Sequence, residues 1–124
     1  MTARVPRRRV WQIALGLYWI LLFTATHYPR VVIPGELPHG DKLLHFGAFG
    51  ALAFLFWRAI SVRVWVAAAI LIPYAALDEW LQQFFGRFTD LMDFVANTTG
   101  IMVVLAAGAL LHKRTTPTSP ERLR

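Results

Sequence analysis

A group of ionisable and amide side chains lies between two apolar runs of this sequence. The segment 78–100 reads DEWLQQFFGRFTDLMDFVANTTG and contains four of the seven acidic residues of the chain. It joins the apolar runs Val64–Phe85 and Leu91–Leu111, so its charges fall at or inside the boundary of a bilayer. An ionisable group at membrane depth costs several kcal/mol unless it is paired or hydrated. These residues are therefore candidates for function.

The composition places the chain among membrane proteins. Its 124 residues suffice for one domain. Hydrophobic residues make up 56% of it and charged residues only 16%, whereas about a quarter of a typical soluble domain is charged. Cysteine is absent, which excludes disulfide bonds and thiolate metal sites. The sequence is therefore too apolar for a small soluble fold.

Four apolar stretches are candidates for membrane-spanning helices: Val10–Thr26, Leu43–Trp57, Val64–Phe85 and Leu91–Leu111. A span needs about 20 residues, with a usual range of about 17–25. The last two are long enough and the first is marginal, while the second reaches this length only with the charged residues at its ends. We therefore predict an all-α membrane protein, a bundle of four transmembrane helices. Residues 10–112 would form it, between a basic segment at 1–9 and a disordered cytoplasmic tail at 113–124.

The basic residues predict the orientation of this bundle. Ten of the thirteen lysines and arginines flank the spans on one side, and Arg30, Lys42 and Arg87 lie on the other. Positive residues accumulate on the cytoplasmic side, so both termini are expected inside a bacterial-type plasma (inner) membrane. The net charge of +6 is thereby explained without nucleic acid, which needs a basic face on a folded domain. No small-residue cleavage site follows the first stretch, which favours an uncleaved anchor over a signal peptide.

With this topology, three groups of polar residues come to the outer side of the membrane. They lie at the start of the second predicted helix, at the end of the third and at the start of the fourth. Residues four apart share a helix face, so Asp93 is expected on the same face as Asn97. Asp78 and Glu79 are consecutive, and we expect only one of them to point inward. The sequence thus predicts a polar cleft that enters the outer leaflet.

These residues have side chains suited to chemistry on an anionic substrate. Lysine and arginine suit a phosphate, whereas carboxylates and histidine suit general acid–base catalysis or a metal ion. The candidate catalytic residues are Asp41, His45, Asp78, Glu79 and Asp93. The candidate substrate-binding residues are Lys42, Gln82, Arg87 and Asn97. A divalent cation with oxygen ligands and a nitrogen ligand from His45 is a further hypothesis, but no motif spacing fixes its ligands.

Structural roles compete with these functional ones. Asp41 is a suitable N-cap for the second predicted helix, and Asp90 with Asp93 forms an acidic version of a capping box. Asp78 and Asn97 fit such roles least well, because both are expected too deep in the membrane for a cap.

For other residues of the same segments, the alternative to a functional role is a role in helix packing. His45 lies one turn into its helix, and its alternative role is that of a packing residue held by a hydrogen bond. Gly47, Gly50 and Gly100 are expected at helix contacts, because small residues let membrane helices approach closely.

The polar residues resemble the two signature blocks of the VanZ-like membrane proteins. The blocks are DKLLHFGAFG at 41–50 and DEWLQQFFGRFTDLMDFVANTTG at 78–100. The matching positions are Asp41, Lys42, His45, Asp78, Glu79, Gln82, Arg87, Asp93, Asn97 and Gly100. With the four predicted spans, the resemblance covers nearly everything from Val10 to Leu111. One departure is Phe49, which stands where an aromatic hydroxyl commonly follows the histidine in this family.

The resemblance implies an integral membrane protein of the cell envelope, and the founding member of the family is associated with low-level teicoplanin resistance. Together with the outer-side polar residues, it suggests action on a lipid-linked or envelope component, as an enzyme or an accessory factor. The alternative is a scaffold or binding protein that alters access of envelope ligands without turnover. A small transporter is less favoured, because no acidic residue is predicted in the cytoplasmic half of any span.

Overall fold

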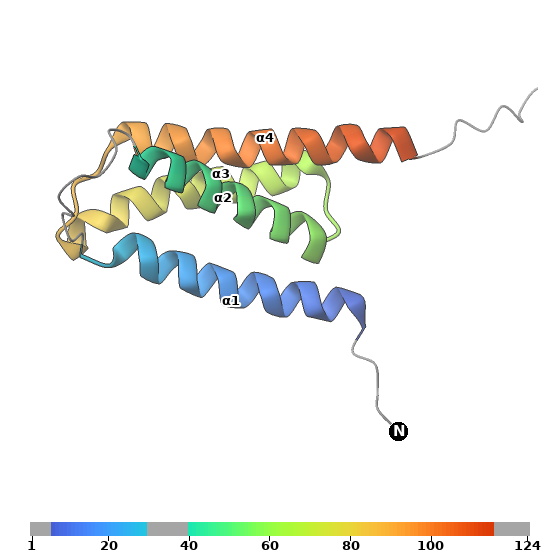
Figure 1. Cartoon of the computed structure of the whole chain (residues 1–124), viewed down its shortest axis with the longest axis horizontal. Coiled ribbons are helices and arrows are strands. Elements are labelled where there is room, and N and C mark those ends of the chain that lie inside the picture. Colours follow the sequence, from blue (N-terminus) through green and yellow to red (C-terminus); the bar gives the residue numbers. More distant parts are fainter. Residues whose placement is uncertain (1–5, 30–39, 116–124) are drawn as a thin grey trace, which may run out of the picture.

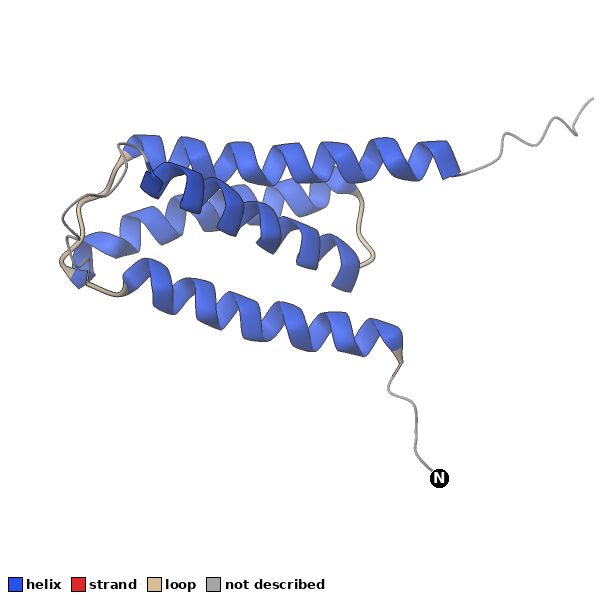
Figure 2. Cartoon of the chain, in the orientation of Figure 1, coloured by secondary structure: helices blue, strands red, loops and turns tan. Residues whose placement is uncertain are grey.

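Four helices run back and forth and form one bundle. The computed structural model describes residues 6–29 and 40–115, and Figure 2 shows that the regular structure of this part is helical. The elements are α1 (Arg7–His27), α2 (Gly40–Ala59), α3 (Val64–Gln82), the short 3-10 helix η1 (Gln83–Phe85) and α4 (Leu91–Thr115). Successive helices alternate in direction, so α1 and α3 end where α2 and α4 begin (Figure 1). The predicted helical bundle is confirmed.

Three helices, α1, α2 and α4, extend beyond the apolar runs of the sequence. α1 begins at Arg7, directly after Pro6 with φ −55°, and this φ suits the start of a helix. α4 continues to Thr115, so the first residues of the predicted disordered tail are helical. The rest of that tail, residues 1–5 and residues 30–39 between the first two helices lie outside the described residues.

Three helical segments are long and apolar enough to cross a membrane, namely Arg7–His27, Val64–Phe85 and Leu91–Lys113. Large apolar side chains such as Leu17 and Ile20 point outward, as expected for a surface in contact with lipid. α2 has 20 residues, but charged residues in its first and last turns shorten its apolar part. The fourth span and the location of both termini therefore stay predictions.

The interface between α2 and α4 is the most extensive in the bundle. Gly100 of α4 lies against the backbone of α2, where an added Cβ would collide with the carbonyl oxygen of Phe46. Gly50 is buried and faces Gly100 across this interface. Both glycines thus have the predicted contact role. Gly47 does not, because it lies at the exposed edge of α2 with open space around it.

The apolar core occupies the middle of the bundle. Its largest fully buried apolar side chains are Phe49, Leu52, Leu71, Ile101 and Leu105. α1 joins this core through Leu15 and Leu22. Since lipid is as apolar as these side chains, close packing rather than exclusion of water holds such helices together.

Gly100→Ala is expected to destabilise the bundle by about 1–3 kcal/mol, the usual cost of forcing extra atoms into a packed contact. The new methyl group would meet the carbonyl of Phe46, a backbone atom that cannot move without its helix. The measurement is thermal melting of the purified protein in detergent. Gly47→Ala is the matched control, since nothing lies within 4 Å of its added Cβ. Equal melting temperatures for the two variants would contradict the close contact between α2 and α4.

Candidate functional site

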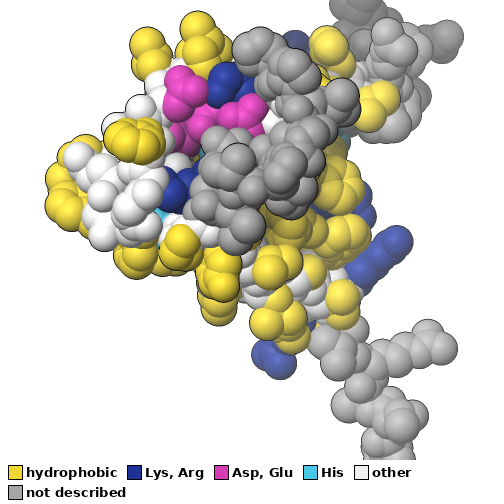
Figure 3. Space-filling view, turned by 60° about the vertical axis from the view of Figure 1, so that its left-hand side comes forward, with side chains coloured by type: hydrophobic (Ala, Val, Ile, Leu, Met, Phe, Trp, Pro, Cys, Tyr) yellow, Lys and Arg dark blue, Asp and Glu magenta, His cyan; other side chains and the backbone are white. Residues whose placement is uncertain are grey.

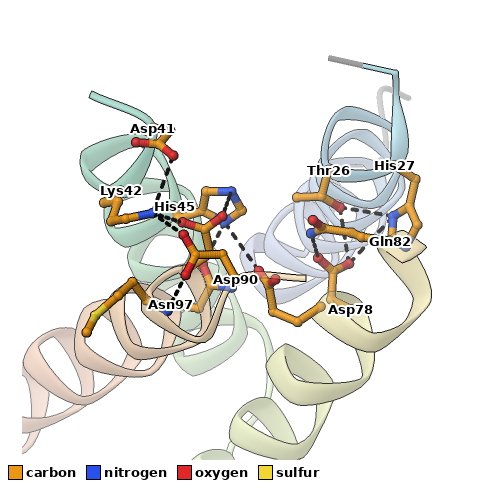
Figure 4. Close-up of polar contacts among 12 residues, drawn as sticks. Thr26, His27, Asp41, Lys42, His45, Asp78, Gln82, Asp90 and Asn97 are labelled. Carbon is orange, nitrogen blue, oxygen red and sulfur yellow. Dashed lines mark hydrogen bonds and ion pairs between the residues drawn. The ribbon is translucent and has the colours of Figure 1, made fainter. Parts of the chain in front are cut away.

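The polar residues singled out in the sequence gather at the end of the bundle where α1 and α3 end (Figure 1). Figure 4 shows two clusters there, one among α2, α3 and α4 and the other between α1 and α3. The His45 cluster consists of His45, Glu79, Asp93 and Asn97, with Lys42 at its rim. The Asp78 cluster consists of Thr26, His27, Tyr74, Asp78 and Gln82.

Asn97 joins three helices within the His45 cluster. Its side chain is fully buried, and its Oδ1 lies 3.1 Å from Nδ1 of His45. Its Nδ2 donates to Oε1 of Glu79 at 3.2 Å. Because an amide oxygen only accepts hydrogen bonds, Nδ1 of His45 carries a proton and donates it. The network therefore fixes the orientation of the imidazole ring.

The other ring nitrogen of His45 faces a carboxylate. Nε2 lies 3.6 Å from Oδ2 of Asp93, and Nδ1 lies 3.8 Å from Oε1 of Glu79. The three residues are buried, with exposed fractions of 8% for His45, 5% for Glu79 and 4% for Asp93. One potential ligand atom from each lies within 4.8 Å of the others. The cluster could therefore hold a metal ion.

Lys42 is surrounded by acidic side chains. Its Nζ lies 2.6 Å from Oδ2 of Asp90, 2.8 Å from Oδ1 of Asp93 and 3.4 Å from Oδ2 of Asp41. Lys42 and Asp41 are about a quarter exposed, so they form the rim of the cluster. The positive charge that the sequence suggested for substrate binding is thus already offset by carboxylates of α2 and of the start of α4.

Asp90 caps α4, as the sequence suggested. Its Oδ1 accepts a hydrogen bond from the backbone N–H of Met92 at 2.8 Å. The ammonium of Lys42, and then the amide of Met92, hold the pKa of Asp90 below its usual range. Asp90 is therefore ionised at neutral pH, and this stabilising charge is lost only as the pH falls through the lowered pKa. Asp93, the other member of the suggested capping box, turns inward to Lys42 and His45.

Asp78 is fully buried and accepts three side-chain hydrogen bonds. The donors are Oγ1 of Thr26 at 3.1 Å, the hydroxyl of Tyr74 at 3.3 Å and Nε2 of Gln82 at 3.2 Å. A buried polar group is tolerated when hydrogen bonds replace its lost hydration. This set of bonds therefore both accommodates Asp78 and joins the end of α1 to α3.

His27 closes the Asp78 cluster at the end of α1. Its Nδ1 donates to the carbonyl of Phe23 at 2.7 Å and lies 3.8 Å from Oδ1 of Asp78. The ring stacks on Phe23 and meets the edge of Phe85. Nε2 of His27 and Oε1 of Gln82 are buried without a hydrogen-bond partner among the described residues.

Asp78 and Glu79 both point into the bundle, which contradicts the expectation that only one of them would. α3 lies between α1 on one side and α2 with α4 on the other, and consecutive helical residues are about 100° apart. Asp78 therefore reaches Thr26, and Glu79 reaches Asn97. The prediction failed because it assumed a single buried face, whereas the end of α3 has two.

Thr26, His27 and Tyr74 are the site residues that the sequence analysis missed. Thr26 is the last residue of the first apolar run, and His27 directly follows it. A usable signal existed, because the predicted topology already placed the end of the first helix beside the end of the third. Tyr74 also bears on the family pattern, since its ring lies 6.0 Å from that of Phe49. A phenolic hydroxyl thus enters this region from α3 instead of α2.

Arg87 is placed by the turn that follows η1. Gly86 has φ 73°, in the left-handed region that favours glycine, and the backbone N–H of Arg87 bonds to the carbonyl of Gln82. The half-buried Arg87 lines an open depression of about 420 Å³ together with Gln83, Gly86, Phe88 and Thr89. Its guanidinium makes no ion pair within residues 6–29 and 40–115.

The acidic side chains reach the surface at this end of the molecule. Figure 3 shows them gathered in one patch, with basic side chains beside it and hydrophobic ones farther out. The side chain of Asp90 is 44% exposed, whereas the side chain of Asp93 is 6% exposed. The charged groups thus extend from the surface into the bundle.

A bundle of apolar helices with polar clusters buried at one end defines an integral membrane protein with a candidate site between its helices. The family model described as VanZ/LLP1 matches residues 5–112, which include both clusters. The chain therefore belongs to the VanZ/LLP1 family, and the resemblance inferred from the two sequence blocks is confirmed. No curated protein and no solved structure matches it significantly.

Thr26→Val is expected to lower stability by about 1–2 kcal/mol, because it removes one donor from the buried Asp78 with little change of shape. The measurement is thermal melting in detergent. Thr24→Val is the control, since Thr24 is exposed on the same helix and bonds only to the carbonyl of Ile20. A similar loss for both variants would show that the bond to Asp78 contributes nothing to the joint between α1 and α3.

Proposed function

We propose that the protein acts on or modulates a lipid-linked or anionic component of the cell envelope, from the outer leaflet of a bacterial-type plasma membrane. The observation that carries this proposal is the burial of His45, Glu79 and Asp93 at the end of apolar helices. Ionisable groups at such depth are costly and typically mark a functional site. Apolar residues of similar size would pack the bundle at lower cost.

Arg87 is the proposed anchor for the anionic head group. Its guanidinium is half-buried beside an open depression, and it lacks an internal ion pair among the described residues. A guanidinium can bind two phosphate oxygens at once. Lys42 would instead hold Asp93 in place, because its own charge is offset by carboxylates.

The His45 cluster is the proposed centre for proton transfer. Nε2 of His45 faces Asp93, and Glu79 lies on the other side of the ring. Histidine beside carboxylates can act as a general acid or base when a substrate proton is within reach. Asp78 and Gln82 were also candidates from the sequence, and we propose that they fix α1 against α3 beside this centre.

The test is lipid mass spectrometry of a deletion strain carrying the wild type, Asp93→Asn or Asp90→Asn. A lipid-linked species should change on deletion and be restored by the wild type, while Asp93→Asn fails at equal membrane abundance. Asp90→Asn should restore it, because asparagine caps a helix as well as aspartate does. The proposal would be wrong if no lipid-linked species changed on deletion.

A non-enzymatic scaffold is the second candidate. The observation that favours it is mutual pairing, since Lys42 contacts three carboxylates and Asp78 accepts three hydrogen bonds without any ligand. In that case Asp93→Asn should lower membrane abundance, and no intermediate should accumulate in the deletion strain.

The proposed orientation has four spans with both termini in the cytoplasm. Because the chain lacks cysteine, single cysteines at exposed loop positions can report on it. We expect Thr89→Cys to react with a membrane-impermeant maleimide in spheroplasts. Ser61→Cys, in the exposed turn between α2 and α3, should react only after permeabilisation. The reverse pattern would contradict the proposed topology, either because the bundle is inverted or because α2 does not cross, and labelling of both without permeabilisation would exclude α3 as a span.

A further inference from the structure

We propose that the His45 cluster binds one divalent transition-metal ion through Nε2 of His45, Oδ2 of Asp93 and Oε2 of Glu79. As an account of what the site does, this inference rests on the proposed function, because it names the cofactor of the same centre. Metal binding itself is measured without any lipid substrate, so the two proposals can fail separately.

Each of the three side chains has one polar atom held by a hydrogen bond and a second polar atom that remains for a metal ion. Nδ1 of His45 donates to Asn97, which leaves Nε2. Oδ1 of Asp93 accepts from Lys42, which leaves Oδ2. Oε1 of Glu79 accepts from Asn97, which leaves Oε2. Metal sites have this arrangement, in which outer partners orient the ligands and fix the histidine tautomer.

The remaining atoms of His45 and Asp93 face each other. Nε2 lies 3.6 Å from Oδ2 of Asp93, and in the tautomer with the only proton on Nδ1 it presents a lone pair toward this oxygen. A cation between the two atoms would offset the repulsion between them. Two ligands about 2.1 Å from a tetrahedral metal ion are about 3.4 Å apart, so the observed spacing already suits coordination.

Glu79 supplies a second, independent observation. Its Oε2 is buried without a hydrogen-bond partner within the described residues, and the residue is only 5% exposed. A buried carboxylate oxygen without a partner is costly. Since one carboxylate oxygen of Glu79 lies within 4.8 Å of the ligand atoms of His45 and Asp93, a rotation of the carboxylate would bring Oε2 to the site.

The donor set indicates the class of metal. One imidazole nitrogen and two carboxylate oxygens suit Zn²⁺ or Mn²⁺, and Zn²⁺ is expected to bind more tightly. The two negative charges would balance a divalent cation. Three protein ligands leave a position for water or a substrate oxygen, where the ion would act as a Lewis acid.

The experiment uses the full chain, purified in detergent micelles and freed of metal with a chelator. Isothermal titration with ZnCl₂ measures affinity and stoichiometry for the wild type, Glu79→Gln and Asp93→Asn. Asp78→Asn is the matched control, because it removes one buried carboxylate from the neighbouring position of the same helix. Size-exclusion chromatography checks that each variant is folded. X-ray absorption of the Zn²⁺-loaded wild type counts imidazole ligands without needing a variant.

We expect one Zn²⁺ per chain in the wild type and in Asp78→Asn, with one imidazole in the absorption spectrum. Glu79→Gln and Asp93→Asn should each weaken binding by at least about tenfold, the loss that even outer partners of a metal site cause. The proposal is overturned if the wild type shows no saturable binding, or if the spectrum shows no imidazole. It is equally overturned if folded Glu79→Gln and Asp93→Asn bind as the wild type does, or if folded Asp78→Asn loses binding to the same extent.

Discussion

The rest of the site depends on a single buried amide, that of Asn97. A buried amide is most stable when both its oxygen and its nitrogen are hydrogen-bonded, and Asn97 bonds in this way to His45 of α2 and Glu79 of α3. These two hydrogen bonds thereby fix how far α2 and α3 lie from α4 at this end of the bundle. Gly100, about one turn farther along α4, lets α2 approach closely enough for the first of these bonds. The polar centre and the close helix packing are therefore two parts of one joint.

The sequence predicted the positions of side chains correctly where a helix packs against its neighbours through one face. Four-residue spacing placed Asp93 and Asn97 on a common buried face, and the four apolar runs predicted the helical bundle. It was uninformative where a helix has neighbours on two sides, as for Asp78 and Glu79. Periodicity measures how polar a face is, but it does not say which helix that face will meet. Thr26 was missed for this reason, since its partner Asp78 lies 52 residues farther along the chain.

The two clusters differ in how their charges are compensated. Around Asp78, neutral donors satisfy a single carboxylate, which is an arrangement suited to holding helices together. Around His45, two carboxylates face the two ring nitrogens, one each, and one lysine lies at the rim. The second arrangement retains an excess of acceptors over donors. This contrast, and not burial alone, separates a structural polar group from one suited to ligand chemistry.

The contact between Gly100 and the Phe46 carbonyl also makes the bundle unequal in stiffness. α2 and α4 meet backbone to backbone, so the distance between them can change little and the two helices form a rigid pair. α1 is attached through apolar side chains, the bond from Tyr18 to Ala48 and the bond from Thr26 to Asp78. Side-chain contacts of this kind can be exchanged for lipid with less loss than a backbone contact. Separation of α1 from the bundle would therefore cost less than separation of α2 from α4.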